Sequence, residues 1–144
     1  MVKVSEVMSR SIVSTSPREA IQMAAKKMKE ADVGCLPVVE GGSLQGVITD
    51  RDIVVCAVAE GRDSSRVMVE ECETHNVFSV DQDADIEEAA RVMRDKQVRR
   101  VPVTRGNQLV GMVSLADLAR RQELHDISKQ VLAHVSQPMV GARR

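Results

Sequence analysis

The chain repeats itself, and this repetition constrains its fold more than any other feature. The string Leu36-Pro37-Val38 recurs as Val101-Pro102-Val103, at an offset of 65 residues. Residues 12–53 align with residues 77–118 without a gap, and twelve of the aligned pairs are identical. In the first copy the identical residues are Ser14, Ile21, Ala24, Ala25, Met28, Val33, Pro37, Val38, Gly41, Leu44, Gly46 and Asp52. Gap-free matching at one offset indicates two copies of one structural unit.

The first part of each copy predicts a short strand followed by a helix. Residues 11–15 form the expected strand, and Ser16-Pro17-Arg18-Glu19 has the composition of a helix start with Ser16 as N-cap and Pro17 as first helical residue. Asp81 has the equivalent cap position in the second copy. An apolar face then follows at helical spacing, made by Ile21, Ala24, Ala25 and Met28 in the first copy and by Ile86, Ala89, Ala90 and Met93 in the second.

The second part of each copy predicts a hairpin and a closing helix. The expected strands are residues 36–39 and 44–48, and residues 101–104 and 109–113. Helices are expected from Asp50, from Leu115 and over residues 123–135. The prediction is an α/β (α+β) fold of tandem β-α-β-β-α repeats with pseudo-two-fold symmetry and a C-terminal helix. We assign residues 1–62 to repeat 1, 63–122 to repeat 2, and 123–144 to a C-terminal helical extension and tail.

Composition excludes several classes of function. Hydrophobic residues make up 43% and charged residues 28%, with a formal net charge of −1, which is ordinary for a soluble globular protein and provides no basic field for nucleic acid or membranes. Phe78 is the only aromatic residue, which counts against base stacking in single-strand binding. The N-terminus lacks the pattern of a signal peptide, and no apolar run is long enough for a membrane span, so we expect a cytoplasmic protein.

The three cysteines, Cys35, Cys56 and Cys72, are widely spaced. Reduced and mostly buried thiols are one interpretation. An intermolecular or redox disulfide is the alternative, with a redox switch through Cys35 or Cys72.

No sequence motif indicates an enzyme or a metal site. His75, His125 and His134 do not occur at metal-ligand spacing, and we expect them at the surface; a zinc site at a dimer interface through His125 or His134 is the alternative. No nucleophile–base pair, Walker loop or dinucleotide-binding glycine string occurs. We therefore expect no catalytic residue, no metal ligand and no required cofactor.

The repeats resemble CBS (cystathionine-β-synthase) domains, and the pair resembles the tandem arrangement called a Bateman module. The resemblance rests on the two Pro-Val strings together with Gly46-Val47-Ile48-Thr49-Asp50-Arg51-Asp52 and Gly111-Met112-Val113-Ser114-Leu115-Ala116-Asp117, and it extends from about Val4 to Arg120. The strings at 49–53 and 97–102 and the C-terminal extension are also similar to the stand-alone mycobacterial hypoxic response protein type.

The resemblance implies binding of an adenosine-containing ligand in clefts between the repeats. In the family, a Gly-x-x-Ser/Thr-x-x-Asp string places a hydroxyl and a carboxylate on one helical turn, where they can hold ribose or phosphate. Thr49 with Asp52, and Ser114 with Asp117, match this string. Helix capping alone is the alternative, because these residue types also favour the first turn of a helix.

The resemblance also implies which residues share a cleft. One cleft would combine Ser16, Ile21, Val33 and Gly34 with Ser114 and Asp117, and the other Asp81, Ile86, Val98 and Arg99 with Thr49 and Asp52. Arg99, Arg100 and Arg51 are the candidates for binding phosphate, since guanidinium groups bind it bidentately. A solvated charged face is the alternative for Arg99 and Arg100.

The sequence thus favours a regulatory sensor that binds AMP or ATP, or else ADP, NAD or S-adenosylmethionine. We expect a homodimer that signals to an unknown downstream protein and binds neither nucleic acid nor membrane. The alternative is a stress-response interaction protein of the hypoxia or redox type with no ligand in its clefts.

Overall fold

The computed structural model describes residues 1–75 and 77–136, and the chain packs as two compact units. Unit 1 comprises Met1–Ile12 and Phe78–Arg144, and unit 2 comprises Val13–Val77. These packing units cross the predicted repeat boundaries, because the first residues of each repeat pack with the other repeat. The predicted C-terminal tail beyond residue 136 lies outside the described residues.

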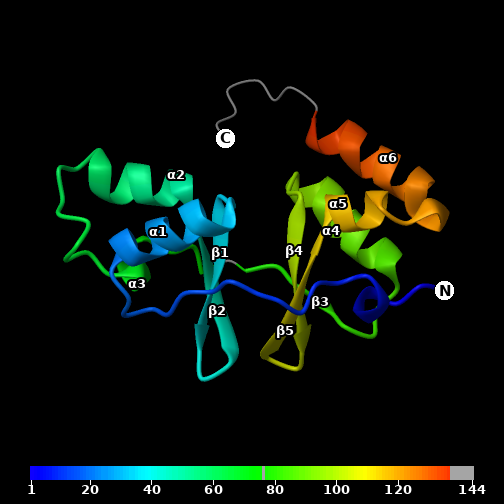
Figure 1. Ribbon diagram of the computed structural model, residues 1–144, viewed down its shortest axis with the longest axis horizontal. Helices are drawn as coiled ribbons and strands as arrows, with labels where there is room; N and C mark the ends of the chain where they lie inside the picture. Colours follow the sequence, from blue (N-terminus) through cyan, green and yellow to red (C-terminus); the bar gives the residue numbers. More distant parts are fainter. Residues whose placement is uncertain (76, 137–144) are drawn as a thin grey trace. The chain divides into compact units, whose positions relative to one another are not determined.

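Unit 2 is built on one antiparallel hairpin with helices packed against it (Figure 1). In the hairpin, Leu36 pairs with Ile48, and both side chains are fully buried. The core also takes in apolar residues of the helices, among them Ile21 and Ala57. The elements are α1 (Ile21–Ala31), β1 (Cys35–Glu40), β2 (Ser43–Thr49), α2 (Asp50–Ile53), the π-helical turn η2 (Val54–Val58) and α3 (Val69–Cys72).

Unit 1 repeats this plan and adds a helix. Strand β4 pairs with β5 antiparallel and with β3 in parallel. Helix α6 packs against α4 and α5 (Figure 1). It buries Val131 and Val135 in the same core as Met93 and Leu118. The elements are the 3₁₀ turn η1 (Val4–Glu6), β3 (Val80–Asp81), α4 (Ile86–Lys96), β4 (Arg100–Arg105), β5 (Gln108–Ser114), α5 (Leu115–Ala119), the 3₁₀ turn η3 (Gln122–Leu124) and α6 (His125–Val135).

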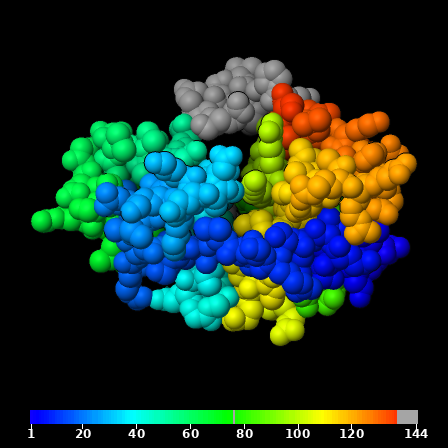
Figure 2. Space-filling model, viewed as in Figure 1, coloured from blue at the N-terminus to red at the C-terminus, as the bar shows by residue number. Residues whose placement is uncertain are grey.

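In each unit a segment from elsewhere in the chain pairs with the second hairpin strand. In unit 1, Ser9 and Met112 exchange backbone hydrogen bonds of 2.8 and 2.9 Å, and Figure 2 shows the dark blue N-terminal residues against the yellow and orange atoms of the second repeat. In unit 2, Thr74 and Val47 do the same at 2.8 and 3.0 Å. This approach requires glycine nearby: a Cβ on Gly111 would lie 2.9 Å from the Ser9 carbonyl oxygen. The repeated glycine therefore has a packing role.

The hairpins and closing helices are confirmed, but the predicted helix starts are wrong. Helix α1 has Ala20 as N-cap, not Ser16, and α4 has Asp85 as N-cap, not Asp81. In unit 2 the Glu19 carboxylate binds the Thr15 hydroxyl and the Lys27 ammonium instead of closing a cap. The helices therefore begin about one turn later than the capping pattern predicts.

Two further expectations change. Residues 11–15, expected to form a strand, make only a single parallel bridge, from Thr15 to Val38. Reduced thiols were the wrong expectation for Cys56 and Cys72, which form a disulfide inside unit 2 with a Cα–Cα distance of 5.7 Å. Packing of α3 beside η2 brings the two residues together, although 16 positions separate them in sequence.

Unit 2 contains one buried carboxyl group with an unusual environment. The Glu73 side chain is only 2% exposed, and its Oε2 lies 3.9 Å from His75 Nδ1. Among the described residues, this oxygen has no hydrogen-bond partner. Burial raises the pKa of Glu73; His75 opposes the rise, and Glu70 and Glu40 add to it. Glu73 lies against Gly46 in unit 2, whereas unit 1 has the apolar side chain of Met8 against Gly111, the corresponding glycine.

We expect Glu73→Gln to stabilise the protein at pH 7 by about 1 kcal/mol, because it removes a buried charge. A raised folded-state pKa means that the stability contributed by protonated Glu73 is fully present below the unfolded-state value. It is lost as pH rises through the folded-state pKa. The advantage of the variant should therefore grow as pH increases from 4 to 7, in urea unfolding at each pH. An identical pH dependence for Glu73→Gln and the control Glu60→Gln, which removes an exposed carboxylate of the same unit, would contradict this prediction.

Candidate functional site

The predicted hydroxyl–carboxylate pairs form the same reciprocal cap in both units. In unit 2, Thr49 Oγ1 accepts a hydrogen bond from the Asp52 backbone N–H at 3.0 Å, and Asp52 Oδ2 accepts one from the Thr49 N–H at 2.9 Å. In unit 1, Ser114 Oγ and Asp117 Oδ2 accept the equivalent bonds at 3.1 and 2.9 Å. Capping therefore occurs in both repeats, and it fixes each hydroxyl beside its carboxylate.

The two pairs differ in what the second carboxylate oxygen does. Asp117 Oδ1 accepts a hydrogen bond from the Arg120 guanidinium, and the Asp117 side chain is 12% exposed. Within the described parts of the chain, Asp52 Oδ1 accepts no hydrogen bond. Asp52 thus keeps one oxygen without a hydrogen bond from the described residues, whereas Asp117 has a cationic partner. Neither residue lines the two pockets described below.

Unit 1 has a pocket of about 440 Å³ whose lining is basic. Its charged lining residues are Arg99 directly before β4, Arg100 at the start of β4 and Lys129 on α6. None of the three belongs to an ion pair with another described residue. The remaining lining residues are Ser114, Leu115, Ala116, Ala119, Ser128 and Leu132. Three cations without a carboxylate in the lining favour an anionic ligand.

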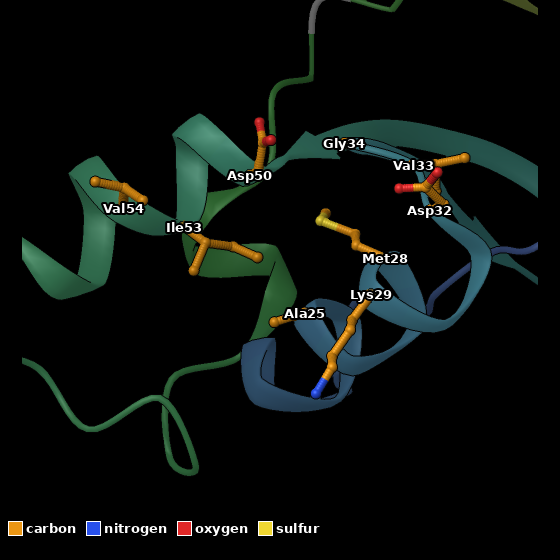
Figure 3. A pocket seen from close by; sticks show the side chains of 9 residues that line it. All are labelled: Ala25, Met28, Lys29, Asp32, Val33, Gly34, Asp50, Ile53 and Val54. Carbon is orange, nitrogen blue, oxygen red and sulfur yellow. The ribbon is translucent and has the colours of Figure 1, made fainter.

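The pocket of similar size in unit 2, about 450 Å³, has a different charge pattern. Figure 3 shows Lys29 on α1 and Asp50 on α2, with Asp32 and Gly34 after α1. Gly34 has the repeat position of Arg99, and a Cβ there would lie 2.9 Å from Asp50 Oδ2. The other lining residues are Ala25, Met28, Val33, Ile53 and Val54. Two carboxylates against one lysine make this pocket a poorer site for phosphate than the pocket of unit 1.

The predicted site residues divide equally between the units. Unit 2 holds Ser16, Val33, Gly34, Thr49, Arg51 and Asp52, and unit 1 holds Asp81, Val98, Arg99, Arg100, Ser114 and Asp117. The structure brings Val33 and Gly34 together in one pocket, and Arg99, Arg100 and Ser114 in the other. The sharing of clefts between units stays a prediction.

Two predicted site residues, Ser16 and Asp81, accept hydrogen bonds within local turns. Ser16 is exposed, and its carbonyl accepts the Glu19 N–H. Asp81 Oδ1 accepts the Asp83 N–H at 2.8 Å. Neither side chain caps the following helix.

Sequence reasoning missed Lys129 and Ser128, which α6 contributes to the pocket of unit 1. The apolar spacing of this segment indicated only a packing helix. No short motif marks Lys129, because its role depends on α6 lying against α5.

The described residues contain no group of three His, Cys, Asp or Glu side chains that could hold a metal ion. His75, His125 and His134 are exposed. Among the described helices, none has the length and apolarity needed to cross a membrane.

Comparison with known proteins identifies relatives over nearly the whole chain. The CBS domain family profile matches residues 4–58 and 69–123. The CBS domain-containing protein YhcV of Bacillus subtilis is 38% identical over 136 residues, which cover 94% of this chain and 96% of YhcV. Hypoxic response protein 1 of Mycobacterium tuberculosis is 36% identical over 143 residues, with 99% of both chains covered.

Solved structures agree with this match. A crystal structure of Hypoxic Response Protein I with two coordinated zinc ions has a TM-score of 0.76 at 36% identity, and covers 83% of this chain and 98% of its own. The CBS domain protein PAE2072 from Pyrobaculum aerophilum, complexed with AMP, has a TM-score of 0.76 at 23% identity, and covers 90% of this chain and 99% of its own. At that identity the second match supports the fold alone. The predicted resemblance is confirmed: the chain belongs to the CBS domain family and carries a tandem pair of its domains.

Proposed function

We propose that this chain is a regulatory module that binds an adenosine-containing ligand. The observation that carries the proposal is the hydroxyl–carboxylate pair fixed at the start of α2, with Asp52 Oδ1 unengaged among the described residues. A carboxylate held in place by its own cap can accept a ribose hydroxyl without being reorganised first. The repeat of this pair at Ser114 and Asp117 supports a second, weaker subsite.

The chemistry of the unit 1 pocket favours a phosphorylated ligand. Arg99, Arg100 and Lys129 offer cationic donors, and the Ser114 hydroxyl adds a neutral one. AMP, ADP and ATP fit this combination better than S-adenosylmethionine, which carries no phosphate. PAE2072, a protein of the same fold, is complexed with AMP, so the fold is compatible with such a ligand.

Asp52→Asn tests the ribose contact. The asparagine oxygen can still accept the Thr49 N–H, whereas the second oxygen becomes an NH₂ donor. We expect AMP affinity to fall about tenfold or more, as for loss of one charge-assisted hydrogen bond, with little change in the unfolding midpoint. Titration calorimetry would measure the affinity, with Glu30→Gln, an exposed carboxylate on α1, as control. Unchanged affinity in Asp52→Asn would mean that this carboxylate does not hold the ribose.

Lys129→Gln tests the phosphate contact. We expect ATP affinity to fall about threefold to tenfold at low salt, because an exposed cation near a phosphate contributes modestly, and we expect adenosine binding to stay the same. Lys96→Gln, which removes an exposed lysine of α4 outside the pocket, should bind ATP like the wild type. Equal losses in both variants would indicate a general effect of net charge.

A ligand-free interaction protein is the second candidate function. Val54, Val55 and Val58 leave between 52% and 65% of their surface exposed on one helical stretch of unit 2, which favours a protein contact there. A homodimer through this surface is compatible with either function.

Native mass spectrometry of the purified protein would report retained nucleotide and subunit number together. A thermal-shift screen in which millimolar AMP, ADP, ATP, NAD and S-adenosylmethionine all fail to stabilise the protein would favour the second candidate, since a ligand at 100 times its Kd should add about 2.7 kcal/mol.

A further inference from the structure

The Cys56–Cys72 disulfide links the stretch after a closing helix to the segment that runs beside it, and we call this contact the junction; both units contain one. Cys56 lies on η2 and Cys72 ends α3. The corresponding positions in unit 1, 65 residues along the repeat, are Arg121 and Val7. There Arg121 Nη1 donates a 3.1 Å hydrogen bond to the Glu6 carbonyl oxygen. The same junction is therefore held non-covalently in unit 1 and covalently in unit 2.

The two sulfurs of the disulfide differ in access and in electrostatic surroundings. Cys72 is 9% exposed within the core of unit 2, whereas Cys56 is only half-buried. Arg62 Nη1 lies 3.8 Å from Cys56 Sγ, and the same guanidinium forms an ion pair with Glu71. Cys56 is therefore the more accessible cysteine, and the Arg62 cation both attracts an incoming thiolate to it and stabilises the Cys56 thiolate when that thiolate leaves in the second step.

We propose that the Cys56–Cys72 disulfide is a thiol–disulfide exchange site at which low-molecular-weight thiols attack Cys56 Sγ and Cys72 is the first group to leave. The incoming thiolate forms a bond to Cys56 Sγ, the Sγ–Sγ bond breaks, and its electron pair passes to Cys72, which takes a proton from water. A second thiolate then attacks the small-molecule sulfur and releases Cys56 as thiolate. Two thiols are oxidised to one small disulfide, and two protein thiols form.

The disulfide lies one helical turn from Asp52, a residue of the proposed ligand site. Asp52 and Cys56 are four residues apart on the continuous stretch formed by α2 and η2, so the disulfide ties the Asp52-bearing helix to α3. Beyond Cys72, the chain pairs with β2 through Thr74. Reduction removes the covalent link between these two parts of unit 2 and leaves unit 1 unchanged. The effect on ligand affinity rests on the proposed function, whereas the exchange chemistry does not.

Peptide-resolved mass spectrometry after alkylation tests the exchange site. Reduced glutathione or dithiothreitol should expose two additional alkylatable thiols, on the peptides of Cys56 and Cys72. With oxidised glutathione, Cys72→Ser should form a mixed disulfide on Cys56 about tenfold faster than Cys56→Ser does on Cys72. Arg62→Gln in the Cys72→Ser background should slow the reaction, and Arg66→Gln, which removes a cation paired with Asp63, should not. Equal or reversed reactivity of the two cysteines, or no thiols released by reduction, would overturn the proposal.

A second measurement examines the consequence of reduction. Reduction should lower the thermal midpoint of the wild type by about 10 °C and leave the Cys56→Ser/Cys72→Ser double variant unchanged. AMP affinity measured by calorimetry should be lower in the reduced protein than in the oxidised protein. AMP that binds neither form would contradict the proposed function while the alkylation result stands by itself. Affinity that is equal in both forms would refute the coupling to the Asp52 site.

Discussion

The turn from the second hairpin strand into the next helix is held by two reciprocal hydrogen bonds in each repeat. The hydroxyl of Thr49 or Ser114 accepts one backbone N–H, and the carboxylate of Asp52 or Asp117 accepts another. Both bonds satisfy N–H groups that would otherwise lack partners at a helix start. They also hold the polar atoms that the proposed function needs, so the fold and the candidate site depend on the same interaction.

Duplication does not make the two units chemically equal. The position that carries Arg99 in unit 1 carries Gly34 in unit 2, and Asp50 stands where unit 1 has Leu115. The pocket of unit 1 is therefore basic, and the pocket of unit 2 has two carboxylates. An anionic group is better stabilised by the first charge pattern. A shared backbone plan thus presents two different electrostatic surroundings.

The junction that follows the closing helix of each unit is also held by different chemistry in the two units. Unit 1 holds it with a hydrogen bond from Arg121, and unit 2 holds it with the Cys56–Cys72 disulfide. Unit 2 also buries Glu73 at a position where unit 1 has Met8. The disulfide and the buried carboxyl group thus both lie in unit 2, which also carries Asp52, whose Oδ1 accepts no hydrogen bond from the described residues.

The sequence by itself determined the duplication, both hairpins, the closing helices and the capping pairs, because these depend on local spacing and on residues within one turn of each other. It predicted the wrong start for α1, because Glu19 finds partners in Thr15 and Lys27 that a local capping pattern does not include. It predicted the wrong start for α4, because Asp81 accepts a hydrogen bond from Asp83 in a local turn and Asp85 caps the helix. Only the tertiary structure decided the disulfide, the burial of Glu73 and the place of Lys129 in a pocket. Each of these arises where segments distant in sequence pack together, and such contacts leave no periodic signal in the chain.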